Sequence, residues 1–221
     1  FQALESSRSI DTVVLDKTGT VTTGQMAVTG LRTTGATQSS DVLRYAGSVE
    51  QASEHAVAAA ISAAARAQHV SLSQAESFQA LPGLGAGGTV DGTEVIVGRA
   101  RLMHERRMVI PAELSDQCAA WERAGSTTVL VSWDGEVHGA VAVGDTVKPS
   151  AAGAVTELRR LGLRPVLLTG DNEGTARAVA AAVGIDDVIA GALPGAKAAI
   201  IRDLQAQGRQ VAMVGDGVND G

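Results

Sequence analysis

Three apolar runs in this 221-residue sequence each lead into an aspartate: VVL precedes Asp16, VLLTG precedes Asp171 and VAMVG precedes Asp216. Short continuous apolar runs are typical of strands buried in a parallel sheet. Because the carboxyl ends of parallel strands meet at one edge of a sheet, we expect these three carboxylates to converge there. The sequence therefore predicts an acidic site assembled from segments that lie far apart in the chain.

Asp16 is the residue of this set best suited to covalent chemistry. It ends the first apolar run and is followed by KTGT, a turn that contains glycine. An aspartate carboxylate can accept a phosphoryl group as a nucleophile. Clustered carboxylates repel one another unless a cation lies among them, and Mg²⁺ suits oxygen ligands beside a phosphate. The predicted Mg²⁺ ligands are Asp16, Asp216, the carbonyl of Thr18, and Asp220 as a ligand or an outer partner.

Phosphoryl transfer also needs positive charge and hydrogen-bond donors around the phosphoryl oxygens. Lys197 can supply the charge, because it stands near the start of a predicted helix, just after Pro194-Gly195. For Asp171 and Asp220, capping of a helix or formation of a turn is an alternative role. The predicted donors are Thr18, Thr169, the Gly170 backbone and Asn219.

The residue two positions after Asp16 indicates what happens to a phosphoryl group once it is bound. A phosphatase with an aspartyl nucleophile needs a nearby proton donor, which assists the leaving group and then activates water. This chain has Thr18 there, and threonine does no general acid–base catalysis near neutral pH. We therefore expect the acyl phosphate to form and persist, which favours an energy-storing intermediate over simple hydrolysis.

The elements that must position these residues form an α/β domain interrupted by an inserted module. The two ends of the chain share the pattern of apolar strands and helices, which predicts a parallel sheet with right-handed crossovers. The middle has Asp-Gly turns between β-prone runs, which predict antiparallel hairpins. We place the α/β domain at residues 1–25 and 144–221, and an antiparallel α+β module at residues 26–143.

Helix and strand boundaries follow from periodicity and from proline and glycine punctuation. Asp91-Gly92 and Asp134-Gly135 are the two predicted hairpin turns. The predicted helices cover residues 41–49, 55–67, 149–162, 173–183 and 194–207. The predicted strands cover residues 12–16, 89–90, 95–97, 129–133, 137–143, 165–168 and 210–214.

Composition narrows the possible partners. Hydrophobic residues make up 45% of the chain, which is enough for a packed core, and the net charge of −6 argues against nucleic acid. The single cysteine permits no disulfide framework, which fits a reducing compartment. No apolar run is long enough to cross a bilayer.

The chemistry-bearing residues resemble five motifs of the P-type ATPases, which belong to the haloacid dehalogenase superfamily. The resemblance implies a Rossmann-like parallel-sheet phosphorylation domain with an inserted nucleotide-binding domain. It also implies that Asp16 is phosphorylated, that Lys197 contacts phosphate and that the last motif binds magnesium. In chain order the motifs are DKTGT at 16–20, a DTVK hinge motif at 145–148, TGD at 169–171, PGAK at 194–197 and GDGVND at 215–220.

The middle module resembles that of the heavy-metal-transporting branch of this family. SEH at residues 53–55 and GLG at residues 83–85 are similar to its nucleotide-binding motifs. The family has proline after the histidine, whereas this chain has Ala56. A dinucleotide-binding loop is a poorer interpretation of the glycines, because a hairpin rather than a helix follows. The residues expected to bind nucleotide are Glu54, His55, Gly83, Gly85 and, from the hinge motif, Asp145.

The resemblance implies an ATP- and Mg²⁺-dependent enzyme that forms an aspartyl phosphate to drive metal transport. The expected partners are a transported heavy-metal cation and the actuator and transmembrane domains of a longer protein. The expected location is the cytoplasmic face of a membrane, such as a bacterial plasma membrane, and the chain would be a fragment that turns over slowly by itself. A stand-alone phosphatase and a non-catalytic ATP-binding module are the alternatives.

Overall fold

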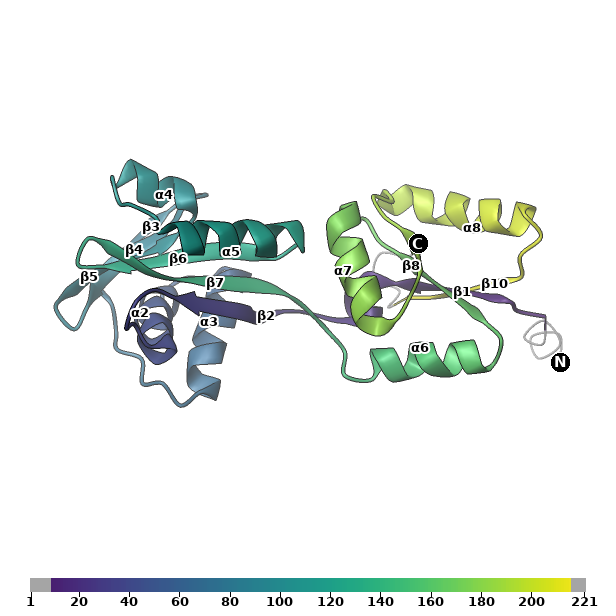
Figure 1. Cartoon of the computed structure of the whole chain (residues 1–221), viewed down its shortest axis with the longest axis horizontal. Helices are drawn as coiled ribbons and strands as arrows, with labels where there is room; N and C mark the ends of the chain where they lie inside the picture. Colours follow the sequence, from purple (N-terminus) through teal and green to yellow (C-terminus); the bar gives the residue numbers. More distant parts are fainter. Residues whose placement is uncertain (1–8, 216–221) are drawn as a thin grey trace. The chain divides into compact units, whose positions relative to one another are not determined.

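The structure is a computed structural model that describes residues 9–215, apart from the side chain of Pro194. The chain divides into two compact units. Unit 1 comprises Phe1–Gln25 and Asp145–Gly221, and unit 2 comprises Met26–Gly144. Unit 1 contains a parallel sheet and unit 2 an antiparallel one, so the predicted α/β class with an antiparallel insertion is confirmed (Figure 1).

The sheet of unit 1 has the strand order β10-β1-β8-β9. Strand β1 lies between β8 and β10 and runs parallel to both, so its carboxyl end shares an edge with theirs. Asp16, the last residue of β1, is level with Leu168 at the end of β8. The strands are β1 (Thr12–Asp16), β8 (Arg164–Leu168), β9 (Asp187–Ile189) and β10 (Val211–Val214).

Helices cover both faces of this sheet, as continuous apolar strands require. Alternate residues of β1 face opposite sides: Val13 packs in the cluster that holds Val155 of α6 and Val183 of α7, whereas Val14 packs near Leu204 of α8. The helices are α6 (Ala151–Arg160), α7 (Glu173–Val183) and α8 (Lys197–Ala206). This sandwich holds the carboxyl edge of β1 in place.

The sheet of unit 2 has six strands in the order β2-β7-β6-β5-β4-β3. Two of its hairpins, β4-β5 and β6-β7, follow from the Asp-Gly turns, in which Asp91 and Asp134 adopt positive φ angles. The strands are β2 (Thr22–Thr33), β3 (Glu76–Leu81), β4 (Gly85–Val90), β5 (Thr93–Gly98), β6 (Thr127–Trp133) and β7 (Glu136–Val147). Strands β2 and β7 are long because each continues from unit 2 into unit 1.

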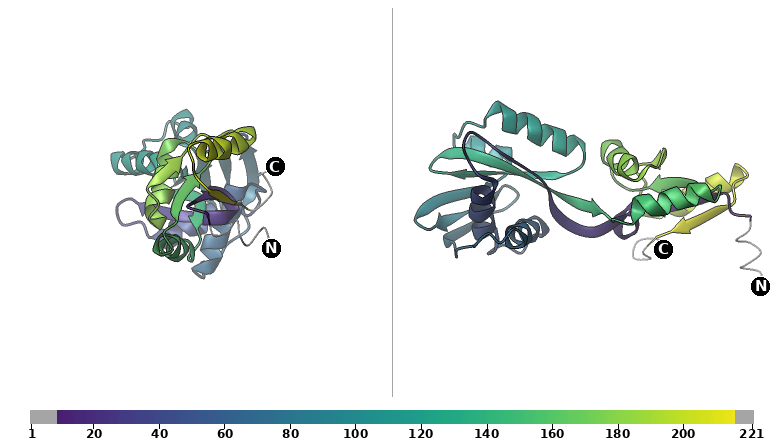
Figure 2. Two further views of the ribbon diagram at one scale, coloured as in Figure 1. Left: turned by 90° about the vertical axis from the view of Figure 1, so that its right-hand side faces the viewer. Right: turned by 60° about the horizontal axis from the view of Figure 1, so that its bottom comes forward.

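Two helix pairs cover the opposite faces of this sheet (Figure 2). One cluster joins Val42 and Val49 of α2 and Ile61 of α3 to strand residues. The other joins Met103 of α4 and Leu114 of α5 to the opposite face. The helices are α2 (Ser39–Glu50), α3 (Ala56–Ala67), α4 (Ala100–Glu105) and α5 (Ala112–Arg123).

The structure confirms the five predicted helices and both hairpins, and it adds elements that the sequence analysis left out. Helix 194–207 is divided, because a 3₁₀ turn at Pro194–Ala196 precedes α8. Helix α3 begins at Ala56, so the helix start does not require the family proline. The added elements are β3, β9, α4, α5 and most of β2. Within residues 9–215 no helix is long and apolar enough to cross a membrane.

Candidate active site and nucleotide cavity

Asp16 lies buried at the carboxyl edge of the parallel sheet, with only 6% of its surface exposed. Its Oδ1 atom lies 3.1 Å from Nζ of Lys197, the first residue of α8. Both side chains are about nine-tenths buried, so the pair interacts in a medium that screens charge poorly. The arrangement places a cation directly beside the carboxylate that the sequence predicts to be a nucleophile.

The residues after β8 lie along the same edge. Thr169 is buried, and its hydroxyl accepts a hydrogen bond from the Asp171 amide at 3.1 Å. Its amide donates to the Ile189 carbonyl at 3.0 Å, which ties the loop to β9. Thr18 lies in the turn after Asp16 and its side chain is exposed. The structure thus brings Asp16, Thr169 and Asp171 to adjacent strand ends.

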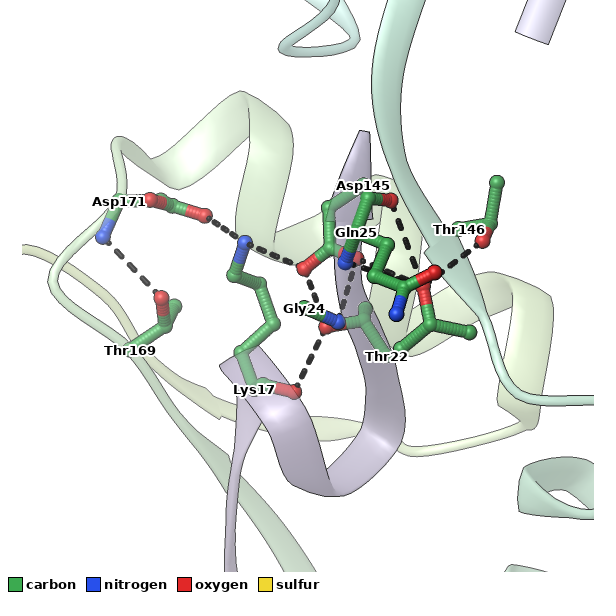
Figure 3. A network of polar contacts seen from close by, with 9 residues as sticks. Lys17, Thr22, Gly24, Gln25, Asp145, Thr146, Thr169 and Asp171 are labelled. Atoms are coloured by element: carbon green, nitrogen blue, oxygen red, sulfur yellow. Dashed lines mark hydrogen bonds and ion pairs between the residues drawn. The ribbon is translucent and has the colours of Figure 1, made fainter. Parts of the chain in front are cut away.

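The carboxylates of Asp171 and Asp145 both lie beside the ammonium group of Lys17 (Figure 3). Nζ of Lys17 lies 2.8 Å from Oδ2 of Asp171 and 3.9 Å from Oδ2 of Asp145. The shorter contact is an ion pair without hydrogen-bond alignment, because Oδ2 of Asp171 makes no hydrogen bond to the described residues. Asp145 also accepts hydrogen bonds from the Gly24 amide at 2.9 Å and from the Thr22 hydroxyl.

Three of the predicted polar residues, Asp216, Asn219 and Asp220, lie outside the described residues. Among residues 9–215, no group of three or more His, Cys, Asp and Glu side chains could hold a metal ion. The predicted ligands inside that range are Asp16 and the Thr18 carbonyl. A buried carboxylate and a backbone carbonyl are oxygen donors of the kind that Mg²⁺ prefers, so these two fit it.

Unit 2 contains a cavity of about 470 Å³, a size suited to a small-molecule ligand. His55, Gly83 and Gly85 line it, and their role in nucleotide binding stays a prediction. Glu54 is exposed and is not among the lining residues, so its contact with nucleotide stays a prediction. Asp145 belongs to unit 1 and likewise does not line this cavity.

Two charged residues that the sequence analysis did not select also line the cavity. Glu50 ends α2 and is 7% exposed, and burial raises its pKa to about 7, partly offset by a hydrogen bond from Ser53. Arg99 precedes α4, and its amide donates to the Leu84 carbonyl at 2.8 Å. The cavity is therefore lined by an acidic residue, an arginine and a histidine as well as by glycines.

Glu50→Gln should make the chain more stable at high pH and no different near pH 4.5. The folded pKa of Glu50 lies above its usual 4.5, so folding takes up a proton between these values. The contribution of Glu50 to wild-type stability is therefore fully present below about pH 4.5 and is lost as the pH rises through 7. At pH 8 the variant should exceed wild type by about 3 kcal/mol in the free energy of unfolding.

Urea unfolding at pH 4.5, 6 and 8 measures this difference, with Glu54→Gln as the control. Glu54 is exposed, so that variant should track wild type at each pH. A constant difference between Glu50→Gln and wild type across the three pH values would contradict the assigned pKa.

Comparison with known proteins identifies the class to which this fold and site belong. A family model described as a haloacid dehalogenase-like hydrolase matches residues 10–221. The chain belongs to the haloacid dehalogenase-like hydrolase family.

Within that family, its sequence and fold are similar to part of the proteins named or titled as heavy-metal P-type ATPases. It is 47% identical over 99% of its length to the "Probable copper-exporting P-type ATPase V" of Mycobacterium tuberculosis, and 43% identical over 98% to the "Copper-exporting P-type ATPase" of Staphylococcus aureus. It covers 28% and 26% of those proteins.

Two solved structures give the same result. A zinc-transporting PIB-type ATPase in the E2.Pi state matches 99% of this chain with a TM-score of 0.87 and 37% identity, and the chain covers 35% of that protein. The catalytic domain of the CPx-ATPase CopB-B, studied upon nucleotide binding, matches 100% of this chain with a TM-score of 0.67 and 27% identity, and is covered to 78%. The resemblance inferred from the motifs is confirmed.

Proposed function

We propose that this chain binds ATP in the cavity of unit 2 and transfers the γ-phosphoryl group to Asp16. The observation that carries the proposal is the buried Asp16 carboxylate with Lys197 at 3.1 Å, at the carboxyl edge of a parallel sheet. Positive charge beside an attacking oxygen lowers the cost of bringing it to an anionic phosphate. This is the arrangement that an aspartyl nucleophile requires.

In the proposed step, an oxygen of Asp16 forms a bond to the γ-phosphorus while the bond to the bridging oxygen of ADP breaks. The electron pair of that bond leaves with ADP. Lys197 and the donors at Thr18, Thr169 and Asn219 offset charge on the phosphoryl oxygens. Mg²⁺, when bound, would neutralise phosphate charge from a site that includes Asp16, the Thr18 carbonyl, Asp216 and Asp220.

In the cavity, we assign His55 to the adenine and the backbone at Gly83 and Gly85 to close contact with the nucleotide. Glu50 is better placed than Glu54 to accept a hydrogen bond from the adenine amino group, because Glu50 lines the cavity and Glu54 does not. Arg99 supplies a cation for the phosphate tail, since a guanidinium binds phosphate oxygens through several N–H groups.

In the intact protein, the aspartyl phosphate would drive transport of a heavy-metal cation across a bacterial plasma membrane. The chain would lie on the cytoplasmic face and act with actuator and transmembrane domains elsewhere in the longer protein. Relatives named as copper-exporting and a structure titled as zinc-transporting support a heavy-metal cation as the cargo. Hydrolysis of the phosphoenzyme would depend on those other domains, so this chain should turn over slowly.

Incubation of the chain with γ-labelled ATP and Mg²⁺ tests the proposal. We expect an acid-stable label that approaches one per chain and is released by hydroxylamine, because that reagent cleaves acyl phosphates. Tight ATP binding without any label would contradict the proposal and favour a non-catalytic module. Rapid multiple turnover of small phosphate esters would contradict it in favour of a phosphatase.

A further inference from the structure

Lys17 follows the proposed nucleophile directly, yet its side chain is directed to other carboxylates. The residue is 8% exposed, and its Nζ lies 2.8 Å from Asp171 and 3.9 Å from Asp145. Asp16 has Lys197 as its partner instead. Three lysines therefore lie at this turn with different partners, because the Lys148 ammonium donates a hydrogen bond to the Gly19 carbonyl.

Asp145 connects Lys17 to β2 and β7, the two strands through which the chain passes between unit 1 and unit 2. It stands near the end of β7, and it accepts hydrogen bonds from Thr22 and Gly24 at the start of β2 (Figure 3). The Thr22 hydroxyl also lies 3.0 Å from the Lys17 carbonyl. Thus one carboxylate joins the turn after Asp16, the start of β2 and the end of β7.

Asp171 connects the same ammonium to the loop after β8. That loop contains Thr169, and its backbone is tied to β9 and to the segment after it, through Ile189 and Ala192. With Lys17 in place, one positive charge lies between two negative ones. Without it, two carboxylates would face each other across a site in which Lys17 and Asp145 are largely buried, which is unfavourable.

We propose that Lys17 is a positioning residue that clamps Asp145 and Asp171 to the turn carrying Asp16. The clamp fixes the backbone that carries Asp16 relative to the start of β2, the end of β7 and the loop after β8, which all belong to unit 1. It also keeps the Lys17 ammonium away from Asp16, so that the charge beside the nucleophile comes from Lys197. The catalytic consequence rests on the proposed function, whereas the clamp itself does not.

The test replaces Lys17 by Met, which keeps the length of the side chain and removes its charge, and by Arg, which keeps the charge. Amide hydrogen exchange reads the clamp directly, because the Gly24 amide donates to Asp145. In Lys17→Met we expect this amide to exchange about tenfold faster, while amides in the middle of β1 and β8 keep their protection. Lys17→Arg should lie closer to wild type. Arg202→Met, an exposed cation on α8, is the control.

The second measurement is the rate of acyl-phosphate formation at saturating ATP. In Lys17→Met we expect it to fall about 10- to 100-fold, because a small misplacement of a nucleophile is costly. The dissociation constant for ATP should stay within about twofold, because the cavity residues belong to unit 2. Adding Asp171→Asn should lower the rate by less than the product of the two single effects.

Unchanged exchange of the Gly24 amide in Lys17→Met overturns the clamp. So does a loss of protection throughout β1 and β8, which would make Lys17 a residue of general stability. A wild-type rate of phosphorylation in a variant with fast Gly24 exchange overturns the positioning role. If the wild-type chain forms no acyl phosphate, the proposed function fails, and the exchange measurement still decides whether the clamp exists.

Discussion

Asp16→Asn is expected to abolish the hydroxylamine-sensitive label, with a loss in the rate of phosphorylation of at least about 1000-fold. The amide is nearly the same size as the carboxylate but cannot attack phosphorus. ATP affinity should change by less than about twofold, since the proposed nucleotide cavity lies in unit 2. Quantification of label after acid quenching, beside a titration of ATP binding, separates the two effects.

Asp11→Asn is the matched control for this experiment. Asp11 precedes the same strand at its opposite end, where its carboxylate accepts a hydrogen bond from the Thr12 hydroxyl at 2.5 Å. That hydrogen bond is the main reason that the pKa of Asp11 lies below its usual value. This variant should be labelled as wild type is. A label that survives in Asp16→Asn would assign the nucleophile to another residue.

Gly85→Ala is expected to disrupt unit 2 and its cavity. Gly85 has a φ angle of +152°, and a Cβ there would lie 2.1 Å from the Val97 carbonyl oxygen. That atom belongs to the backbone of β5, so it cannot move aside without separating β4 from β5. We expect the free energy of unfolding to fall by about 3 kcal/mol or more, with ATP affinity at least tenfold weaker.

Gly83→Ala provides the comparison within the same motif. Gly83 also has a positive φ angle, +74°, but a Cβ there would meet nothing within 4 Å. The expected cost is about 1 kcal/mol from the backbone conformation alone. Thermal unfolding followed by tryptophan fluorescence reports on unit 2, because Trp121 and Trp133 both lie there. Equal losses in the two variants would contradict the steric argument.

The parallel sheet could be predicted because the pattern that indicates each strand or helix lies within that segment and the residues beside it. The apolar runs before Asp16 and Asp171 have the length and composition of buried strands, and the Pro and Gly residues mark the ends of the helices between them. Strand β3 was missed because half of the residues in ESFQAL are polar and the strand lies at the edge of its sheet. Strand β9 has only three residues, too few to produce a periodic signal.

In the candidate sites, only the residues that belong to recognisable motifs could be predicted from the sequence. Glu50 is one of two acidic residues near His55 in the sequence, and only its burial in the cavity distinguishes it from Glu54. The partners of Lys17 are more than 120 positions away in the chain, so no local pattern could pair them. Tertiary packing decides which carboxylates meet which cations, and sequence spacing does not record it.

The insertion of unit 2 has a consequence for how the chain is made. Strand β1 is synthesised first, but both strands that pair with it, β8 and β10, come after all of unit 2. During translation the segment that carries Asp16 therefore has no strand partner within its own sheet until the whole of unit 2 has been synthesised. Within unit 2, β4 and β5 form one hairpin and β6 and β7 another, and pairs of neighbouring strands form quickly. Synthesis of the cavity residues is thus complete before the sheet that carries Asp16 can assemble.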